Sequence, residues 1–316
     1  MIQYFNFNHN NSTAVPTEAE AAWIHLEKPT EEEITTLSKE YQIPKNYFLA
    51  ILDNQEVPRY ESPHQTDFEK PVLLLLQYPH SIVSPSGFKQ YETYPFTIIL
   101  TSDKIFTASN FPAAFLGKFS ELFFTNPDVS LNERLTLQLA LHIADTFNQF
   151  VASLKVEMDD LESQLRVATE NRQLYQLMDI QKSLVYFKVA IGQNISALEA
   201  FSKSKLQMIS EESHHYLHTS LVEMKQALSS TSIQLQLVSQ ISDMFSAIVS
   251  NNLNIVMKVL TSLTIVITIP TIIGGLYGMN VRLPFSDADN AFWILCGLTA
   301  LICIITVRIL KKRKYF

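Results

Sequence analysis

The stretch SNNLNIVMKVLTSLTIVITIPTIIGGLYGMN (250–280) decides how this chain is built. Within it, residues 255–276 form an apolar run of about the 20 residues that a helix needs to cross a bilayer. Its one charged residue, Lys258, lies near the start of the run, where a long side chain can reach the membrane surface. A second apolar run, 291–309, follows after a gap that is too short for a domain. We therefore expect two membrane helices joined by an external loop, 277–290.

The residues that follow the second run set the expected orientation. The tail 310–316 is basic, and positive charge next to a span favours the cytosolic side. No cleavable signal pattern opens the chain, so we expect the part before the first span to stay on the side where it is made. These features predict a multi-pass protein of the plasma membrane with both termini in the cytosol.

Composition and charge exclude several classes of function. The net charge of the 316 residues is −7, which argues against a nucleic-acid partner. Cys296 and Cys303 both lie inside the second apolar run, where they form neither a disulfide framework nor a zinc pattern. We find no nucleophile elbow, no paired catalytic carboxylates and no phosphate-binding loop. The sequence therefore predicts neither an enzyme nor an ATP-driven pump.

The first part of the chain, 1–127, is predicted to be a cytosolic α/β domain. Residues 72–80 and 94–109 are rich in β-branched and aromatic residues and are interrupted by turn-forming ones, as strands are. Residues 30–41 begin with a threonine, continue with acids and then show helical spacing, which is typical of a capped helix.

From residue 128 onward the pattern becomes helical. Between Ser130 and Asn254 there is no proline, and apolar residues recur at intervals of three and four. We expect antiparallel cytosolic helices over 128–210. The last helix shows no stop signal between residues 211 and 276, so it would be about 100 Å long at 1.5 Å per residue. Its part 211–254 is then a stalk that continues into the first span.

One face of the first span carries polar or small residues at alternating intervals of three and four. Such a face is either a seam between packed membrane helices or a wall that faces water. Two spans cannot enclose a pore, so a conducting form requires a ring of several chains. The residues of this polar face are Asn254, Met257, Thr261, Thr264, Thr268, Thr271 and Gly275.

The polar face ends at a glycine-rich turn. Gly278 can take a positive φ and end the helix, while Gly274 and Gly275 permit close approach of neighbouring backbones. Asn280 would stand at the external end of the face, and in a ring it would present several amide oxygens. Mg²⁺ prefers oxygen partners and gives up its water reluctantly, which suits such a ring. The alternative is that Asn280 only caps a helix.

The stretch YGMN, placed after a long helix and a first span with a second span close behind, resembles the CorA family of magnesium channels, as does the terminal KKRKYF. Residues 250–280 are similar to that family's pore helix, including its mid-membrane Pro270. WIHLEKPTEEEI and EVPRYE resemble stretches of its cytosolic head. The resemblance implies a funnel-shaped homopentamer with an α+β cytosolic head, a long helical stalk and two C-terminal transmembrane helices, passing Mg²⁺ and also Co²⁺ or Ni²⁺.

The resemblance also assigns roles to residues of the pore. Gly278, Met279 and Asn280 match its external selectivity filter. Met257 and Leu260 match an apolar constriction that closes the pore by excluding water. The pore-lining positions that match are Asn254, Met257, Leu260, Thr271 and Gly275, and Thr261, Thr264 and Thr268 share their face.

The family senses cytosolic Mg²⁺ through acids between neighbouring heads. Asp243 matches one of these acids, whereas Leu49 and Ala50 stand where relatives carry an acidic pair. Asp53, one turn later, is the candidate substitute; the alternative is that regulation is weaker or sited elsewhere.

The external loop also departs from the family. Arg282 lies close to the mouth, where its charge opposes cation capture. Asp287 and Asp289 are expected to restore a negative external rim.

Other features and functions remain as alternatives. His214 and His218 have the spacing of a transition-metal pair, or they belong to a solvated helix face. The acidic residues within 157–162 form either a weak binding site for a divalent cation or a solvent-exposed helix face. As a whole, the chain could instead be a Zn²⁺-directed relative of the same fold, or a non-conducting membrane-anchored helical scaffold.

Overall fold

A computed structural model of the chain describes residues 1–8, 11–62, 70–116, 129–165, 171–204, 210–279, 281 and 290–313. The chain divides into two compact units, Met1–Ser242 and Asp243–Phe316. Helix α5 (Glu211–Tyr277) contributes residues to both units.

The first unit is built on a mixed sheet of seven strands in the order β2-β1-β3-β7-β6-β5-β4. The pair β3 and β7 is parallel, and every other neighbouring pair is antiparallel. The β-rich runs predicted from the sequence are confirmed as β5, β6 and β7. The strands are β1 (Ile2–Asn8), β2 (Asn11–Ala14), β3 (Trp23–Glu27), β4 (Arg59–Glu61), β5 (Val72–Val83), β6 (Lys89–Leu100) and β7 (Ile105–Ser109).

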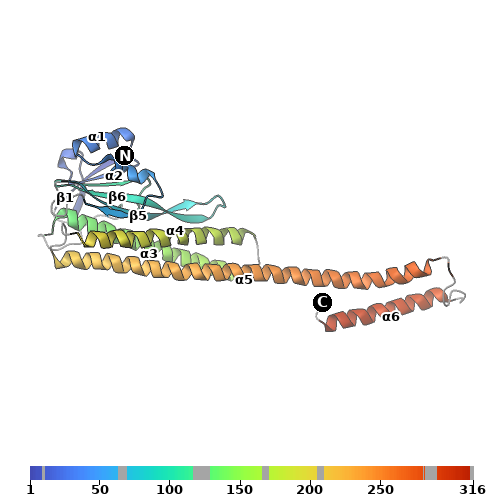
Figure 1. Ribbon diagram of the computed structural model, residues 1–316. Coiled ribbons are helices and arrows are strands. Elements are labelled where there is room, and N and C mark those ends of the chain that lie inside the picture. Colours follow the sequence, from blue (N-terminus) through green and yellow to red (C-terminus); the bar gives the residue numbers. More distant parts are fainter. Residues whose placement is uncertain are drawn as a thin grey trace. The chain divides into compact units, whose positions relative to one another are not determined.

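Helices cover both faces of this sheet (Figure 1). Helices α1 (Glu31–Glu40) and α2 (Lys45–Leu49) lie on one face, and α3 and α4 lie on the other. The predicted threonine cap is present: Thr30 accepts a hydrogen bond from the backbone of Glu33, whose side chain accepts one in return. This capping box satisfies N–H groups that the helix start would otherwise leave free. Short 3₁₀ turns, η1 (Glu18–Glu20) and η2 (Ala50–Leu52), flank these helices.

The helices α3 (Leu131–Leu165) and α4 (Asn171–Ser202), together with α5, are the three that the spacing of apolar residues predicts. Helix α4 packs on β5 and β6 and completes their hydrogen bonding. Beside β5, at a level that β4 does not reach because it begins only opposite Leu75, the buried side chain of Asn194 accepts from the Gln77 N–H at 2.8 Å and donates to its carbonyl at 2.7 Å. A helix side chain thus replaces the missing strand.

The first part of α5 packs within the first unit. The Gln234 amide donates to the Val151 carbonyl of α3 at 3.1 Å, in a buried position. On α4, Glu199 pairs with Lys225 at 3.2 Å. Because both ends of this ion pair are about half exposed, the buried contact to α3 contributes more to docking.

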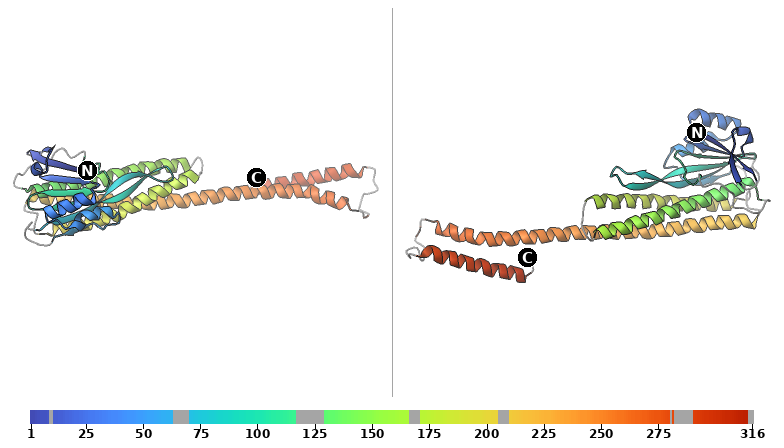
Figure 2. Two further views of the ribbon diagram at one scale, coloured as in Figure 1. Left: turned by 90° about the horizontal axis from the view of Figure 1, so that it is seen from above. Right: turned by 180° about the vertical axis from the view of Figure 1, so that it is seen from behind.

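The second unit consists of the rest of α5 and of α6 (Ala291–Lys312), which runs back beside it (Figure 2). Both helices contain stretches that are long and apolar enough to cross a membrane. Only 6% of the most apolar window of α5 is buried, and none of that of α6, unlike core helices of soluble proteins. Since water would be a poor solvent for such surfaces, these helices belong in a bilayer.

Candidate functional site

The polar face of α5 points away from α6. Ser262 is fully buried, and Val266 and Ile273 are partly buried, so these residues mark the side toward α6. Thr264 and Thr268 lie about half a turn around the helix from these residues. They are exposed, as is the rest of the polar face. Within one chain, the face is therefore not the seam between the two spans.

The threonine hydroxyls of this face are oriented by the helix itself. Thr264 donates to the Leu260 carbonyl at 2.8 Å, Thr268 donates to the Thr264 carbonyl at 2.7 Å, and Thr271 donates to the Ile267 carbonyl at 3.0 Å. Each hydroxyl proton is thereby engaged, while the oxygen lone pairs stay free. The face presents hydrogen-bond acceptors.

The inner part of the face is more apolar. Met257 and Leu260 lie one turn apart, and each residue is about half exposed, 51% and 54%. Asn254, Thr261 and Gly275 are also exposed. Every residue of the expected pore lining is thus free of contacts that would bury it within the chain.

The outer end of the face closes as a tight turn. Helix α5 ends at Tyr277; the Gly278 N–H donates to the Gly274 carbonyl at 3.0 Å, and the Met279 N–H donates to the Leu276 carbonyl at 3.2 Å. Gly278 does not have a positive φ, so that expectation was wrong: ordinary helical bonds reach it. A Cβ at Gly278 would lie 3.3 Å from the Gly274 carbonyl oxygen, a tight contact that requires the neighbouring backbone to give by a few tenths of an ångström.

Two neighbouring glycines make no close approach within the chain. A Cβ at Gly274 or Gly275 would meet no described atom within 4 Å. Gly274 lines a groove on the side toward α6, whereas the backbone surface at Gly275, on the polar face, remains open to another molecule. Met279 is 53% exposed. Asn280, Arg282, Asp287 and Asp289 lie outside the described residues.

The candidate regulatory acids lie in different units. Asp53 is exposed, and its carboxylate accepts from the Gln55 N–H at 2.9 Å. Asp243 is exposed on α5. Ala50 belongs to the hydrophobic core, and Leu49 packs against it, so acids could not stand there without desolvation. Over the described ranges, no cluster of three or more histidine, cysteine or acidic side chains is placed to hold a metal.

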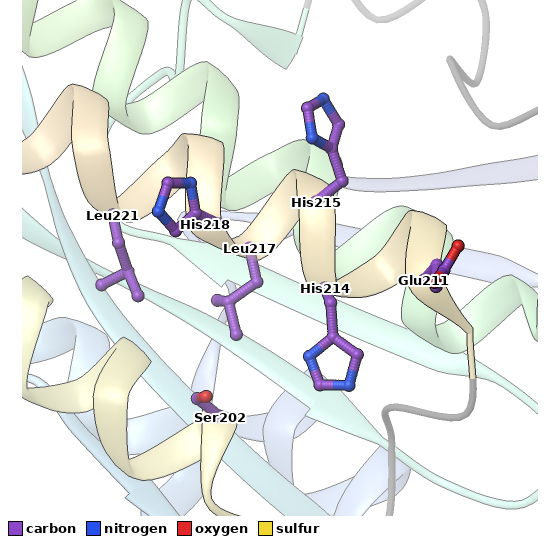
Figure 3. A pocket seen from close by; sticks show the side chains of 7 residues that line it. All are labelled: Ser202, Glu211, His214, His215, Leu217, His218 and Leu221. Atoms are coloured by element: carbon purple, nitrogen blue, oxygen red, sulfur yellow. The ribbon is translucent and has the colours of Figure 1, made fainter.

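The histidines of α5 line a cavity of about 620 Å³ without converging (Figure 3). His214 and His215 point to opposite sides of the helix. With His218 and Glu211 in the same lining, the group still does not provide a three-ligand site. A solvated helix face describes these residues better than a metal centre.

The acids of α3 behave in a similar way. Asp160 accepts from the Gln164 amide at 2.8 Å on the exposed surface. Partial burial raises the pKa of the Glu157 carboxyl, which Lys89 and Ser153 oppose. A weak divalent site on this helix gains no support.

A groove of about 450 Å³ between α5 and α6 was not predicted from the sequence. It is lined by Pro270 and, from α6, by both cysteines, Cys296 and Cys303. Pro270 is the sequence feature that could have indicated a special contact here, because a proline inside a helix leaves one carbonyl without its usual donor. The sequence could not show which α6 residue faces that carbonyl.

Comparisons with known proteins agree on the family. The family model described as CorA-like Mg2+ transporter protein matches residues 18–312. A protein named cobalt/magnesium transport protein CorA, from Methanocaldococcus jannaschii, is 24% identical over 297 residues, which cover 92% of this chain and 90% of that protein. Its namesake from Thermotoga maritima is also 24% identical, over 174 residues covering 55% of this chain and 50% of that protein.

Solved structures share the fold. The complete structure of the CorA magnesium transporter from M. jannaschii matches with a TM-score of 0.81 at 19% identity, covering 100% of this chain and 99% of that one. The full-length CmaX protein matches with a TM-score of 0.73 at 15% identity, covering 98% and 97%. At such identities these structures show the fold alone, whereas the family model spans most of the sequence. The chain belongs to the CorA-like Mg²⁺ transporter family.

Proposed function

We propose that this chain forms a homo-oligomeric channel for passive uptake of Mg²⁺, with Co²⁺ and Ni²⁺ as further cargoes. The observation that carries the proposal is the polar face of α5, which is exposed, points away from α6 and presents hydroxyl oxygens as acceptors. The waters around a hydrated cation offer hydrogens outward, so a wall of acceptors suits a cation. The names of the family and of its curated members support the same cargo.

An oligomer is required because a polar helix face is unfavourable against lipid. A polar helix face in a bilayer must meet protein or water, and α6 does not cover it. Copies of the chain arranged around one axis would turn these faces toward a shared aqueous path. The open backbone at Gly275 would let neighbouring copies approach closely. Resemblance to the CorA family favours five copies in a funnel.

Selection and closure occur at opposite ends of the path. Gly278, Met279 and Asn280 would form the external filter, in which a ring of neutral amide oxygens contacts the hydrated ion. Met257 and Leu260 would form the apolar constriction that closes by excluding water. The membrane potential drives a divalent ion inward with about 4–5 kcal/mol per 100 mV, so no second energy source is needed.

Orientation, regulation and cation capture depend on charged residues outside the pore lining. The basic end of α6 faces the cytosol of the cell, as does the N-terminal unit. Cytosolic divalent ions regulate the channel through Asp243 and Asp53, with ligands shared between copies. Asp287 and Asp289 attract cations to the external mouth, and Arg282 weakens that attraction.

The test is Mg²⁺ uptake into proteoliposomes with an inside-negative potential. The unmodified protein should show uptake, and Asn280→Ala should lower it at least about tenfold, the equivalent of one hydrogen-bonding contact. Asn290→Ala, in the same loop at the start of α6, should leave uptake unchanged. Equal uptake by Asn280→Ala would defeat the filter. Absence of flux in the unmodified protein would favour a scaffold, and Zn²⁺ flux that exceeds Mg²⁺ flux would favour the zinc-directed relative.

A further inference from the structure

Pro270 leaves a gap in the hydrogen bonding of α5 at membrane depth. Proline has no N–H, so the carbonyl of Val266, four residues earlier, receives no bond from its usual donor. A soluble helix would recruit water at that carbonyl. In the hydrocarbon core no water is available, so the carbonyl needs a donor from a neighbouring helix.

That donor is a thiol of α6. The sulfur of Cys303 lies 3.8 Å from the Val266 carbonyl oxygen, within the reach of a weak S–H···O hydrogen bond. The nearby hydroxyl of Thr299 is already engaged, because it donates to the Leu295 carbonyl of its own helix at 2.7 Å. Among the described side chains, Cys303 is the one that supplies this carbonyl.

We propose that the Cys303–Val266 hydrogen bond is a latch that fixes the course of α5 past Pro270. The proline lies between Thr268 and Thr271, so a change of angle there would shift the outer part of the polar face relative to the inner part. Cys303 is a positioning residue in this scheme. Its effect on ion flux rests on the proposed function, whereas its effect on helix packing does not.

Loose packing beside the latch makes this single bond important. The groove of about 450 Å³ separates the two helices next to Pro270, so few side-chain contacts can take over the role of the bond. Cys296 lines the same groove but is exposed. It therefore provides a matched control with the same chemistry on the same helix.

A double-mutant cycle tests the latch without reference to transport. In the detergent-solubilised full chain, Cys303→Ala should lower Tm by about 1–3 °C, as expected for one interhelical hydrogen bond in a membrane. In a Pro270→Ala background the backbone N–H is restored, and the same substitution should have no effect. Cys303→Ser supplies a donor and should keep Tm, and Cys296→Ala should change nothing in either background.

Flux provides the second measurement. Cys303→Ala should lower Mg²⁺ uptake into proteoliposomes roughly threefold, and Cys303→Ser should restore it. An equal loss of Tm in both backgrounds would overturn the latch. The latch would also be overturned if Cys303→Ser lost as much Tm and uptake as Cys303→Ala. This comparison does not depend on whether Pro270→Ala folds. Coupling in Tm without any uptake by the unmodified protein would support the latch and reject the channel.

Discussion

At the scale of single residues, one buried imidazole makes the first unit sensitive to acid. His25 on β3 is fully buried, and its Nδ1 lies 2.9 Å from the hydroxyl oxygen of Thr107, which also accepts from the Trp23 indole at 2.9 Å. Burial, together with the charge of the chain's amino terminus, lowers the pKa of His25 to about 4. The ring is therefore neutral in the folded protein at neutral pH.

The free energy of unfolding should fall as pH drops from about 6.5 to 4. The unfolded chain binds a proton at the ordinary pKa of histidine, near 6.5, before the folded chain does, so acid favours unfolding across this window by about 3 kcal/mol. Urea titrations followed by Trp23 fluorescence in a Trp293→Phe background measure it. His25→Gln should remove this part of the pH dependence, and the exposed His218→Gln should retain it. The prediction would be contradicted if the free energy of unfolding depended on pH in the same way in His25→Gln and in its parent.

The tight turn at Gly278 predicts a second single-residue effect. A methyl group 3.3 Å from the Gly274 carbonyl oxygen makes a tight contact, which the end of α5 relieves only by giving a few tenths of an ångström. Strain of about 1 kcal/mol would lower Mg²⁺ uptake by Gly278→Ala roughly fivefold. Gly297→Ala, on α6 where a Cβ meets nothing within 4 Å, is the control that should transport normally. A Gly278→Ala protein with full uptake would show that the turn tolerates a side chain.

At the scale of elements, α4 stabilises the sheet through one buried amide. Asn194→Ala would leave both backbone groups of Gln77 buried without a partner, which should lower the free energy of unfolding by about 2–4 kcal/mol. Ser196→Ala, on the exposed side of α4, should cost less than about 0.5 kcal/mol. Urea unfolding compares the two variants. If Asn194→Ala and Ser196→Ala had nearly the same free energy of unfolding, the backbone of Gln77 would have other hydrogen-bond partners.

The polar face of α5 can be tested by removing its oxygens while keeping its shape. Thr268→Val and Thr271→Val keep the side-chain volume and delete the acceptors, so each should lower Mg²⁺ uptake and the double variant should lower it further. Thr299→Val on α6 makes the same chemical change away from the face and should transport normally. If the two single variants and the double variant transported as well as Thr299→Val, the hydroxyls would have no role in conduction.

Local signals in the sequence were sufficient for most elements. Acids after Thr30 predicted the capped α1, and the absence of stop signals predicted α5 as one helix, which the structure confirms from Glu211 to Tyr277. Spacing also grouped the threonines on one face. It could not decide between seam and water-facing wall, because that depends on where α6 packs. The positive φ expected at Gly278 failed for a similar reason: composition shows what glycine permits, and hydrogen bonds decide what it adopts.

At the scale of the whole molecule, one chain leaves its functional surface incomplete. The polar face has no partner along α5 within the described residues, and the backbone at Gly275 on that face is open. These are the properties of a wall that other copies complete. Neither periodicity nor a single chain gives the number of copies, because that number is set by contacts between chains.

Labelling of single cysteines along α5 tests the central claim most directly. In a Cys296→Ala, Cys303→Ser background, a charged, water-soluble thiol reagent should modify Thr264→Cys and Thr268→Cys in proteoliposomes and block Mg²⁺ uptake. Val259→Cys and Leu263→Cys, which lie one turn apart on the opposite side of α5, should remain unmodified. Modification of the Val259 and Leu263 variants, with the threonine positions protected, would contradict the account, because the polar face would then not line a shared aqueous path.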